Sequence, residues 1–364
     1  MKWLKRILKW TGGLLLLYVG GFLLYGTLTD WTPDPIIPLE ALEARPQEDA
    51  KSVISDSSLT LVTWNIGYAG LGETAYFFYD RGDFFWTDMG GVRTPENEVE
   101  AALNGAEVAV SALAADFYLL QEVDSFSRRS HYVMQIDSLR DRQPRFQAHF
   151  TKNYKNNRVP IPIFQPWDHY GYVRSGLLSM SRFKADSAVR LALPGELSWP
   201  TRLFQLDRCV LRQSYPTSWG DTLVVYNVHL SAYDDGSKKA IEMTWLRQQL
   251  IADVEAGYKV VVGGDWNQVP PGFDYARFSP LLADQFYQLE VKHDFMPPGW
   301  KWIYDPGEPT NRKAQTPYSE KESPKTLIDF FLVGPGLSID KVQTINQQFQ
   351  FSDHQPVRLQ VTFQ

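Results

Sequence analysis

The sequence predicts an α/β fold in which two β-sheets pack face to face with helices on the outside. Apolar, strand-like runs recur from Leu59 to the C-terminus, with helix-like stretches between them. Strands and helices alternate in the first half, and strands dominate the second. A length of 364 residues with 44% hydrophobic residues suits one large α/β domain with an appendage, or two modest domains.

The N-terminus has the composition of a membrane anchor. Residues 1–10 contain Lys2, Lys5, Arg6 and Lys9, and the 18 residues from Thr11 to Leu28 carry no charge. A helix needs about 20 apolar residues to span a bilayer. We therefore predict a cytoplasmic basic segment over 1–10 and a single transmembrane helix over 11–28. Because positive charge stays inside, the rest of the chain is expected outside the cytoplasm. A cleaved signal peptide and a buried helix are the alternatives.

Residues 29–57 contain four prolines among charged residues and predict an extended linker: Pro33, Pro35, Pro38 and Pro46. One folded domain is then expected over 58–364.

In the first half of that domain, Leu59–Ile66 alternates and is rich in β-branched residues, which predicts a strand that Gly67 ends. Arg93–Ala115 predicts a helix with a buried stripe at Val99, Leu103, Ala106, Val110 and Leu113. Asp116–Val123 is the next strand. Ser175–Phe183 is another, after a long region without regular pattern.

The second half predicts four strands and one helix. Asp221–Ala232 and Lys259–Asn267 are strands on either side of a helix at about Lys239–Ala256. In that helix we expect Ile241, Trp245, Leu250 and Val254 to face inward. Thr326–Val333 and His354–Phe363 complete the domain.

Polar side chains lie at or near the ends of these strands: Asn65, Glu122, His229, Asp265, Asn267, Asp329, Asp353 and His354. A rigid sheet directs such residues into a shared cleft. Carboxylate and amide oxygens bind hard cations such as Mg²⁺, Mn²⁺ or Ca²⁺. Imidazoles and further carboxylates supply the proton acceptor and positive charge that phosphoester hydrolysis requires.

Other reaction classes find no support. The sequence has no G-x-S-x-G elbow, Walker loop or dinucleotide-binding glycine motif. Its one cysteine, Cys209, excludes an intramolecular disulfide, and no Cys/His spacing indicates structural zinc. The net charge of −6 gives no general attraction for nucleic acid, although a local basic patch remains compatible with it.

Six short motifs occur in a characteristic order: TWNIG, QEVD, NVHLSA, GGDWN, LIDFFLV and SDHQPV. Together they resemble the endonuclease/exonuclease/phosphatase superfamily from about Leu59 to the C-terminus. The resemblance implies a four-layered α/β sandwich, two mixed sheets with outer helices, and a divalent-metal-dependent phosphoric ester hydrolase. Gly67 departs from the acidic residue of many nucleases in the group, and GDWN replaces the usual GDFN.

The resemblance also implies a role for each residue. Glu122, Asn65 and Asp353 are expected at the metal. Asp265 would orient or activate the attacking water, and Asn267 would bind a phosphate oxygen. His354 would contact the scissile phosphate with Asp329 as its orienting carboxylate, and His229 is a candidate acid for the leaving group.

Two further segments bear on the substrate. The basic segment Asp137–Arg174, with Arg158 and Arg174 as candidate substrate-binding residues, is either a solvated surface or a site for an anionic headgroup. The aromatic loop Ala75–Gly91 is expected to cover the cleft, enter a lipid interface or form a satellite core.

We therefore expect a membrane-anchored phosphoesterase acting on a phosphorylated lipid or inositol-phosphate headgroup, without a protein partner. An extracytoplasmic nuclease that binds nucleic acid ranks second. A non-catalytic binding protein of the same fold ranks third.

Overall fold

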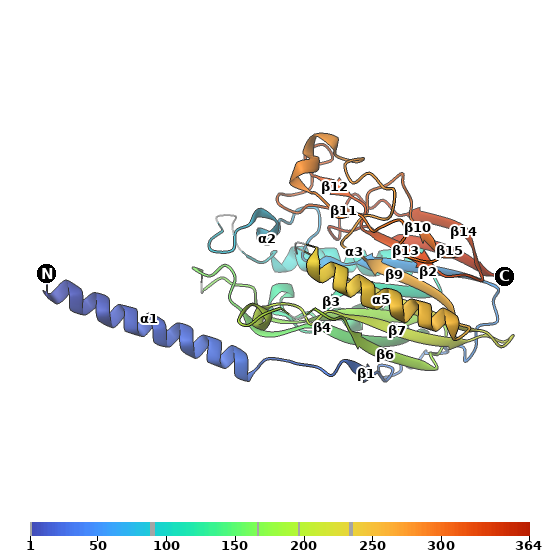
Figure 1. Cartoon of the computed structure of the whole chain (residues 1–364), viewed down its shortest axis with the longest axis horizontal. Helices are drawn as coiled ribbons and strands as arrows, with labels where there is room; N and C mark the ends of the chain where they lie inside the picture. Colours follow the sequence, from blue (N-terminus) through green and yellow to red (C-terminus); the bar gives the residue numbers. More distant parts are fainter. Residues whose placement is uncertain (1, 88–91, 166, 196, 233–235) are drawn as a thin grey trace.

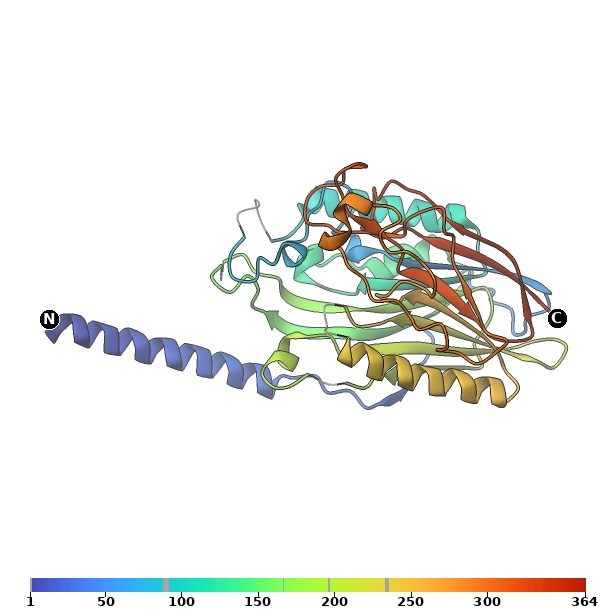
Figure 2. The same cartoon turned by 45° about the horizontal axis from the view of Figure 1, so that its top comes forward.

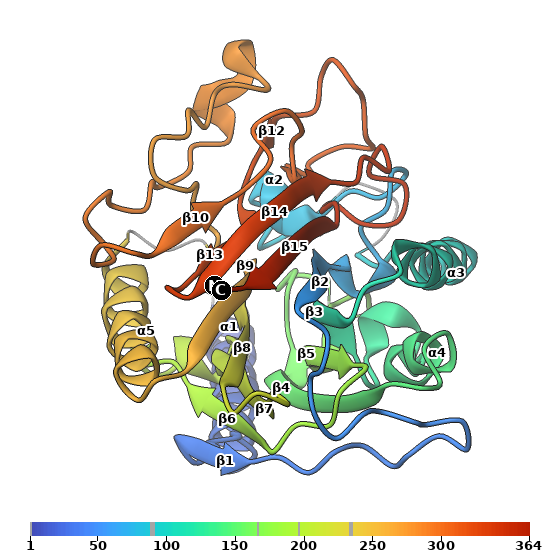
Figure 3. The same ribbon diagram turned by 90° about the vertical axis from the view of Figure 1, so that its right-hand side faces the viewer.

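The computed structural model describes residues 2–364 except 88–91, 166, 196 and 233–235. It confirms the predicted fold: two mixed β-sheets pack face to face, with helices on their outer faces (Figure 1; Figure 3). The N-terminal helix α1 (Lys2–Leu28) extends away from this sandwich (Figure 2).

The first sheet has seven strands in the order β1-β6-β7-β8-β9-β13-β10. Their bounds are Ile36–Pro38 (β1), Ser187–Ala192 (β6), Cys209–Pro216 (β7), Thr222–His229 (β8), Lys259–Asp265 (β9), Asp329–Val333 (β13) and Lys301–Ile303 (β10). Strands β8 and β9 are parallel, and the remaining neighbours are antiparallel. Helix α5 (Ser237–Glu255) covers the outer face.

The second sheet has six strands in the order β14-β15-β2-β3-β5-β4. Their bounds are Leu337–Thr344 (β14), Val357–Phe363 (β15), Ser58–Asn65 (β2), Phe117–Asp124 (β3), Gly171–Ser181 (β5) and Gln147–Val159 (β4). Only β2 and β3 are parallel. Helices α3 (Glu96–Leu113) and α4 (Gln135–Asp141) cover its outer face. Short elements complete the chain: α2 (Phe78–Arg81), β11 (Asn311–Arg312) and β12 (Lys325–Thr326).

Alternation along the strands divides the core into three layers. In β2, Leu59 and Leu61 lie between the two sheets, whereas Val62 and Trp64 pack against α3. In β9, Val261 lies between the sheets, whereas Val260 packs on the α5 side. The central strands are buried on both faces, which explains their nearly continuous apolar sequences.

Every predicted strand and helix is present, with most ends displaced by a few residues. The stripe predicted for α3 is buried as expected. In α5, Ile241 was predicted to face inward but is exposed, because the buried face is set by Met243, Leu246 and Leu250. The segment before Ser175, which showed no pattern, contains the 13-residue strand β4. Its mixed polar and apolar sequence fits its position at the edge of the sheet.

The segment 29–57 lies along the domain. Strand β1 pairs with β6, and single bridges join Lys51 to Phe183 and Ile54 to Thr217. Ile54 is fully buried between the sheets. Among the described residues, α1 is the one helix long and apolar enough to cross a membrane.

A polar contact joins the two sheets below their open end. The buried Gln121 on β3 donates a hydrogen bond from Nε2 to Oδ1 of the buried Asn227 on β8, at 2.8 Å. Asn227 in turn donates to the carbonyl of Leu120 and to Oγ of Ser179. The Gln121 N–H and the Asn227 amide are thus paired across the interface between the sheets.

We predict that Asn227→Ala lowers the free energy of unfolding by about 1–3 kcal/mol, because it removes the buried hydrogen bonds that Asn227 makes with Gln121, Leu120 and Ser179. Urea unfolding measures this change. Asn104→Ala is the control, since Asn104 is exposed on α3, and it should not lower the free energy of unfolding by more than about 0.5 kcal/mol. Equal stabilities of the two variants would contradict a structural role for the inter-sheet pair.

Candidate active site

The strand ends that carry the predicted residues meet at one end of the sandwich. Asn65, His229 and Asp265 are the last residues of β2, β8 and β9, and Asp329 is the first residue of the antiparallel β13, paired with Asp265. Each lies on the same strand face as the apolar residues between the sheets, such as Leu61, Val225 or Val261, so its side chain also points between the sheets.

Glu122 reaches this cluster through a β-bulge. The pairing of β3 with β5 shifts by one residue between Leu120 and Val123, and Glu122 has a left-handed backbone with φ of 53°. In a regular strand, Glu122 would share the face of Leu120 and point toward α3. The extra residue re-aims its carboxylate toward the site, which is a common function of bulges beside active sites.

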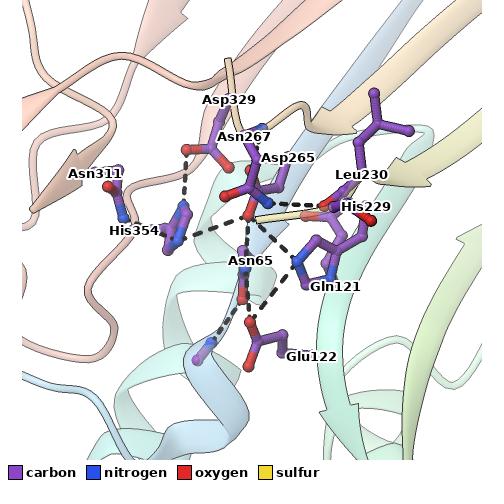
Figure 4. Close-up of polar contacts among 12 residues, drawn as sticks. Asn65, Gln121, Glu122, His229, Leu230, Asp265, Asn267, Asn311, Asp329 and His354 are labelled. Atoms are coloured by element: carbon purple, nitrogen blue, oxygen red, sulfur yellow. Dashed lines mark hydrogen bonds and ion pairs between the residues drawn. The ribbon is translucent and has the colours of Figure 1, made fainter. Parts of the chain in front are cut away.

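Asp265 is the centre of the cluster (Figure 4). Its Oδ2 accepts a hydrogen bond from Asn65 Nδ2 at 3.0 Å and lies 3.6 Å from His229 Nε2 and 3.8 Å from His354 Nε2. Its Oδ1 accepts from the backbone N–H of Asn267 at 2.9 Å. One carboxylate therefore contacts residues from both sheets.

The Asn65 amide is oriented by its partners. Nδ2 donates to Asp265 and, at 3.3 Å, to Glu122 Oε1, while Oδ1 accepts from the backbone N–H of Gly67 at 3.0 Å. The N–H groups thus hold two carboxylates together, and one lone pair of Oδ1 remains for a cation. Asn65 therefore orients Asp265 and Glu122, and its Oδ1 can still bind a metal ion as predicted.

His354 and Asp329 form a buried ion pair. Nδ1 of His354 lies 2.8 Å from Oδ2 of Asp329, and the Asn311 amide lies 2.9 Å from Nε2 (Figure 4). Burial opposes a charge on His354, but Asp329, Asp265 and Asp353 outweigh it and raise its pKa well above the usual value. Burial also raises the pKa of Asp329 to about 6. The surrounding carboxylates therefore favour the charged form of His354.

His229 is electrostatically different. Its pKa is lowered well below the usual value by burial, and nearby Arg208 and His354 lower it further. Its Nδ1 is buried and makes no hydrogen bond in the described part of the chain. The surroundings thus favour the neutral form of His229 and the charged form of His354, and both imidazoles lie within 4 Å of Asp265 Oδ2.

Asp353 lies on the Glu122 side of the site. Its pKa is raised to about 7 by burial and by the negative charge of Glu122, against the lowering effect of His354. Gly67 makes room for it: a Cβ there would lie 2.8 Å from Asp353 Oδ1, and the φ of +53° already favours glycine. A larger residue at position 67 would therefore collide with the Asp353 carboxylate.

Two groups of side chains offer ligands for a divalent cation. Glu122, Asp353 and Asn65 form the predicted set, which supplies oxygen atoms only, and Glu122 is its partly exposed carboxylate. Asp265, Asp329 and His354 form a second set, with ligand atoms within 4.8 Å of one another. In this second set, Nδ1 of His354 is already paired with Asp329 Oδ2.

Asn267 follows Asp265 by two residues and lies at the same end of the sandwich. Its backbone is left-handed, with φ of 50°. Its Nδ2 donates to the Leu230 carbonyl at 2.9 Å, which leaves one N–H for a substrate oxygen. The backbone carbonyl of Asn267 accepts from Lys239 Nζ at 2.8 Å.

In the described part of the chain, neither Arg158 nor Arg174 makes a hydrogen bond or ion pair with any of these eight residues. Arg174 donates to the carbonyls of Asn156 and Val173 and stacks on the Tyr172 ring, so it is tied to the β4–β5 hairpin. Arg158 is exposed near the end of β4, beside the C-terminal end of α1. Their role in binding substrate stays a prediction.

Sequence patterns did not reveal Arg129. It is buried behind Glu122, with NH1 3.9 Å from Glu122 Oε2, two hydrogen bonds to Asp124 and a stacking contact with the Tyr68 ring. Asn311 was also missed, because Arg129 lies in a three-residue 3₁₀ turn and Asn311 in the two-residue strand β11, and elements this short have no periodicity. Only the fold shows that they flank the motif residues.

The model of the Endonuclease/Exonuclease/phosphatase family matches residues 62–354, a range that contains all ten predicted site residues. No curated protein sequence matches the chain.

Solved structures share the fold at low identity. An endonuclease/exonuclease/phosphatase from Beutenbergia cavernae DSM 12333 has a TM-score of 0.53 and 17% identity, over 85% of this chain and 72% of its own. TDP2 from Caenorhabditis elegans has a TM-score of 0.52 and 12% identity, over 85% and 76%. A Bacteroides vulgatus endonuclease/exonuclease/phosphatase has a TM-score of 0.51 and 12% identity, over 85% and 100%.

We predict that Asp329→Asn lowers the pKa of His354, because it removes the negative charge that contributes most to raising that pKa. Titration of the histidine ring signals by NMR measures the shift. Asp340→Asn, an exposed change on β14, should leave the pKa of His354 as it is. An unchanged pKa in Asp329→Asn would show that the pair is not the source of the charge.

Proposed function

We propose that this chain, which belongs to the endonuclease/exonuclease/phosphatase family, is a membrane-anchored, metal-dependent phosphoesterase that acts on a lipid or inositol-phosphate headgroup. The observation that supports hydrolysis is the convergence of Asn65, His229 and His354 on one carboxylate, Asp265, next to Glu122. A proton acceptor, a positively charged hydrogen-bond donor and a cation site rich in oxygen ligands then lie close together at one end of the sandwich.

The metal would be bound by Glu122, Asp353 and Asn65. Burial and the negative charge of Glu122 raise the pKa of Asp353 to about 7. A bound cation would offset the repulsion between these two carboxylates and stabilise their charged forms. Mg²⁺, Mn²⁺ or Ca²⁺ bound there would polarise a phosphate oxygen and stabilise the charge that develops during hydrolysis.

The protein's own groups supply the remaining chemistry. The His354 imidazolium, held by Asp329, donates a hydrogen bond to a phosphate oxygen. Asp265 orients the attacking water and accepts its proton. His229 is neutral in the free protein, so it acts as the acid only after the negative charge of a bound phosphate raises its pKa.

The membrane assignment rests on helix α1. Its 27 residues reach about 40 Å at 1.5 Å per residue, enough to cross a bilayer. We propose that its basic N-terminus is cytoplasmic and that the domain from about residue 58 lies outside. The strand ends that form the site lie at the end of the sandwich from which α1 extends (Figure 1). This placement favours a substrate at the membrane.

A nuclease is the second candidate, because the β4–β5 hairpin gathers positive charge. The pKa of Lys152 is lowered by burial and by the neighbouring charges of Lys155 and Arg174. A bound phosphate group would offset the repulsion between these positive charges. Either a lipid headgroup or a nucleic-acid backbone supplies such a phosphate.

The test is hydrolysis by the full chain, with Mg²⁺ or with a chelator, of sphingomyelin, phosphoinositides and plasmid DNA. We expect metal-dependent release from a lipid substrate with the DNA intact. Metal-dependent nicking of DNA, with intact lipids, would instead establish the nuclease. Inactivity on all three would contradict the proposed substrate class.

We predict that Glu122→Gln lowers turnover at least about 100-fold, since it removes a ligand charge with little change in volume. The exposed Glu100→Gln on α3 is the matched control and should retain full turnover. Circular dichroism establishes that both variants are folded. Full activity of a folded Glu122→Gln protein would exclude Glu122 from the metal site.

A further inference from the structure

Six large apolar side chains are exposed on three loops: Phe85 and Trp86 after α2, Ile163, Phe164 and Trp167 between β4 and β5, and Trp199 before the 3₁₀ turn Thr201–Phe204. We call this set the aromatic platform. Phe164 and Trp167 are 63% and 67% exposed. A soluble surface rarely exposes so many large apolar side chains on adjacent loops, and such patches mark interaction sites.

The first two loops are joined into one surface. The backbone N–H groups of Ile163 and Phe164 donate to the carbonyls of Phe84 and Phe85, at 3.0 and 2.9 Å. The rings of Phe85 and Phe164 stack with centroids 5.8 Å apart, and those of Trp86 and Trp167 meet edge to face at 6.1 Å. The outward rings are therefore held in place by backbone pairing beneath them.

The third loop connects the platform to α1. Trp199 Nε1 donates to Thr27 Oγ1 at 3.1 Å, and the Phe204 ring stacks on Phe22 with centroids 5.6 Å apart. Arg202 forms an ion pair with Asp30, just beyond the helix. The last turns of the candidate transmembrane helix are thus packed on a loop of the domain.

The loops that carry the platform project from the end of the sandwich from which α1 extends, in the same direction as the helix (Figure 1; Figure 2). The C-terminal ends of β2, β3, β8 and β9, which form the candidate active site, point to this same end. If α1 crosses a bilayer, the aromatic rings therefore contact the surface of that bilayer, and the candidate active site faces it.

We propose that the aromatic platform inserts into the interfacial layer of the bilayer that α1 spans, so that the active site faces the lipid headgroups of that bilayer. Trp and Phe rings suit this layer because they are large, apolar and tolerant of its wet boundary. Exposed Arg158 and half-buried Lys155, beside the end of α1, add attraction for anionic headgroups. The substrate part of this inference rests on the proposed function, whereas the docking of the platform does not.

The decisive experiment uses the full chain in lipid vesicles. A polarity-sensitive fluorophore is attached to Phe164→Cys or, as matched control, to Trp219→Cys. Trp219 is also an exposed aromatic residue, but it packs against Phe363 near the C-terminus, at the opposite end of the sandwich. The native Cys209 is fully buried and should not react.

Both proteins remain anchored by α1, so a difference between them reports the platform. We expect nitroxide-labelled acyl chains to quench the label at Phe164→Cys at least about threefold more than at Trp219→Cys. Equal quenching would overturn the proposal. A label at Phe164→Cys that is shielded from aqueous iodide but not quenched by the lipid would also overturn it, and would indicate a protein partner.

Activity then separates this inference from the proposed function. In the triple variant Phe85→Ser, Phe164→Ser, Trp167→Ser, turnover of lipid in vesicles should fall about tenfold relative to turnover of a water-soluble phosphoester by the same protein. Trp219→Ser should keep the ratio of the unaltered chain. If the unaltered chain hydrolyses no phosphoester, the proposed function fails while the quenching result still decides the platform. If it hydrolyses vesicle lipid but Phe164→Cys is not quenched, only the platform fails.

Discussion

The active site depends on one geometric constraint: the side chains of a strand alternate between its two faces. On the central strands, the face that supplies Leu61, Val225 and Val261 to the core between the sheets also supplies the polar residues at the strand ends. The core therefore turns from apolar to polar along its length, first at the Gln121–Asn227 pair and then at Asn65 and Asp265. The two sheets can supply one site because their inner faces are already packed together.

Hydrogen bonds compensate for the burial of many of these polar groups. Asn65 holds Asp265 and Glu122, Asp329 holds His354, and Trp64 Nε1 donates to the backbone carbonyl of His354 at 3.0 Å. In Trp266, which replaces the usual phenylalanine of the GDFN motif, the ring stacks on Phe330 and its N–H donates to the Phe330 carbonyl. The strand ends are thus held by contacts on the outer faces of the sheets as well as by contacts between the sheets, which favours a preorganised site.

The direction of the strands also links catalysis to the membrane. Because β2, β3, β8 and β9 end at the same edge of the sandwich, their loops and the active site share one end. The basic β4–β5 hairpin, the aromatic platform and the C-terminal turns of α1 lie at that end too. Under the proposed function, this arrangement suits a substrate that lies in the plane of the bilayer, since the lipid would not have to leave the membrane to reach the site.

The sequence by itself determined the α/β class, the principal strands and helices and the eight motif residues, because periodicity and short motifs are local properties. It also identified the apolar N-terminal helix by length and charge. Only the tertiary structure decided that a bulge re-aims Glu122, that Arg129 and Asn311 flank the site, and that Arg158 and Arg174 lie apart from it. It also revealed β4 and the attachment of residues 36–54 to the domain. These features depend on contacts between residues distant in the chain, such as Asn311 with His354 or Trp199 with Thr27, which no local pattern encodes.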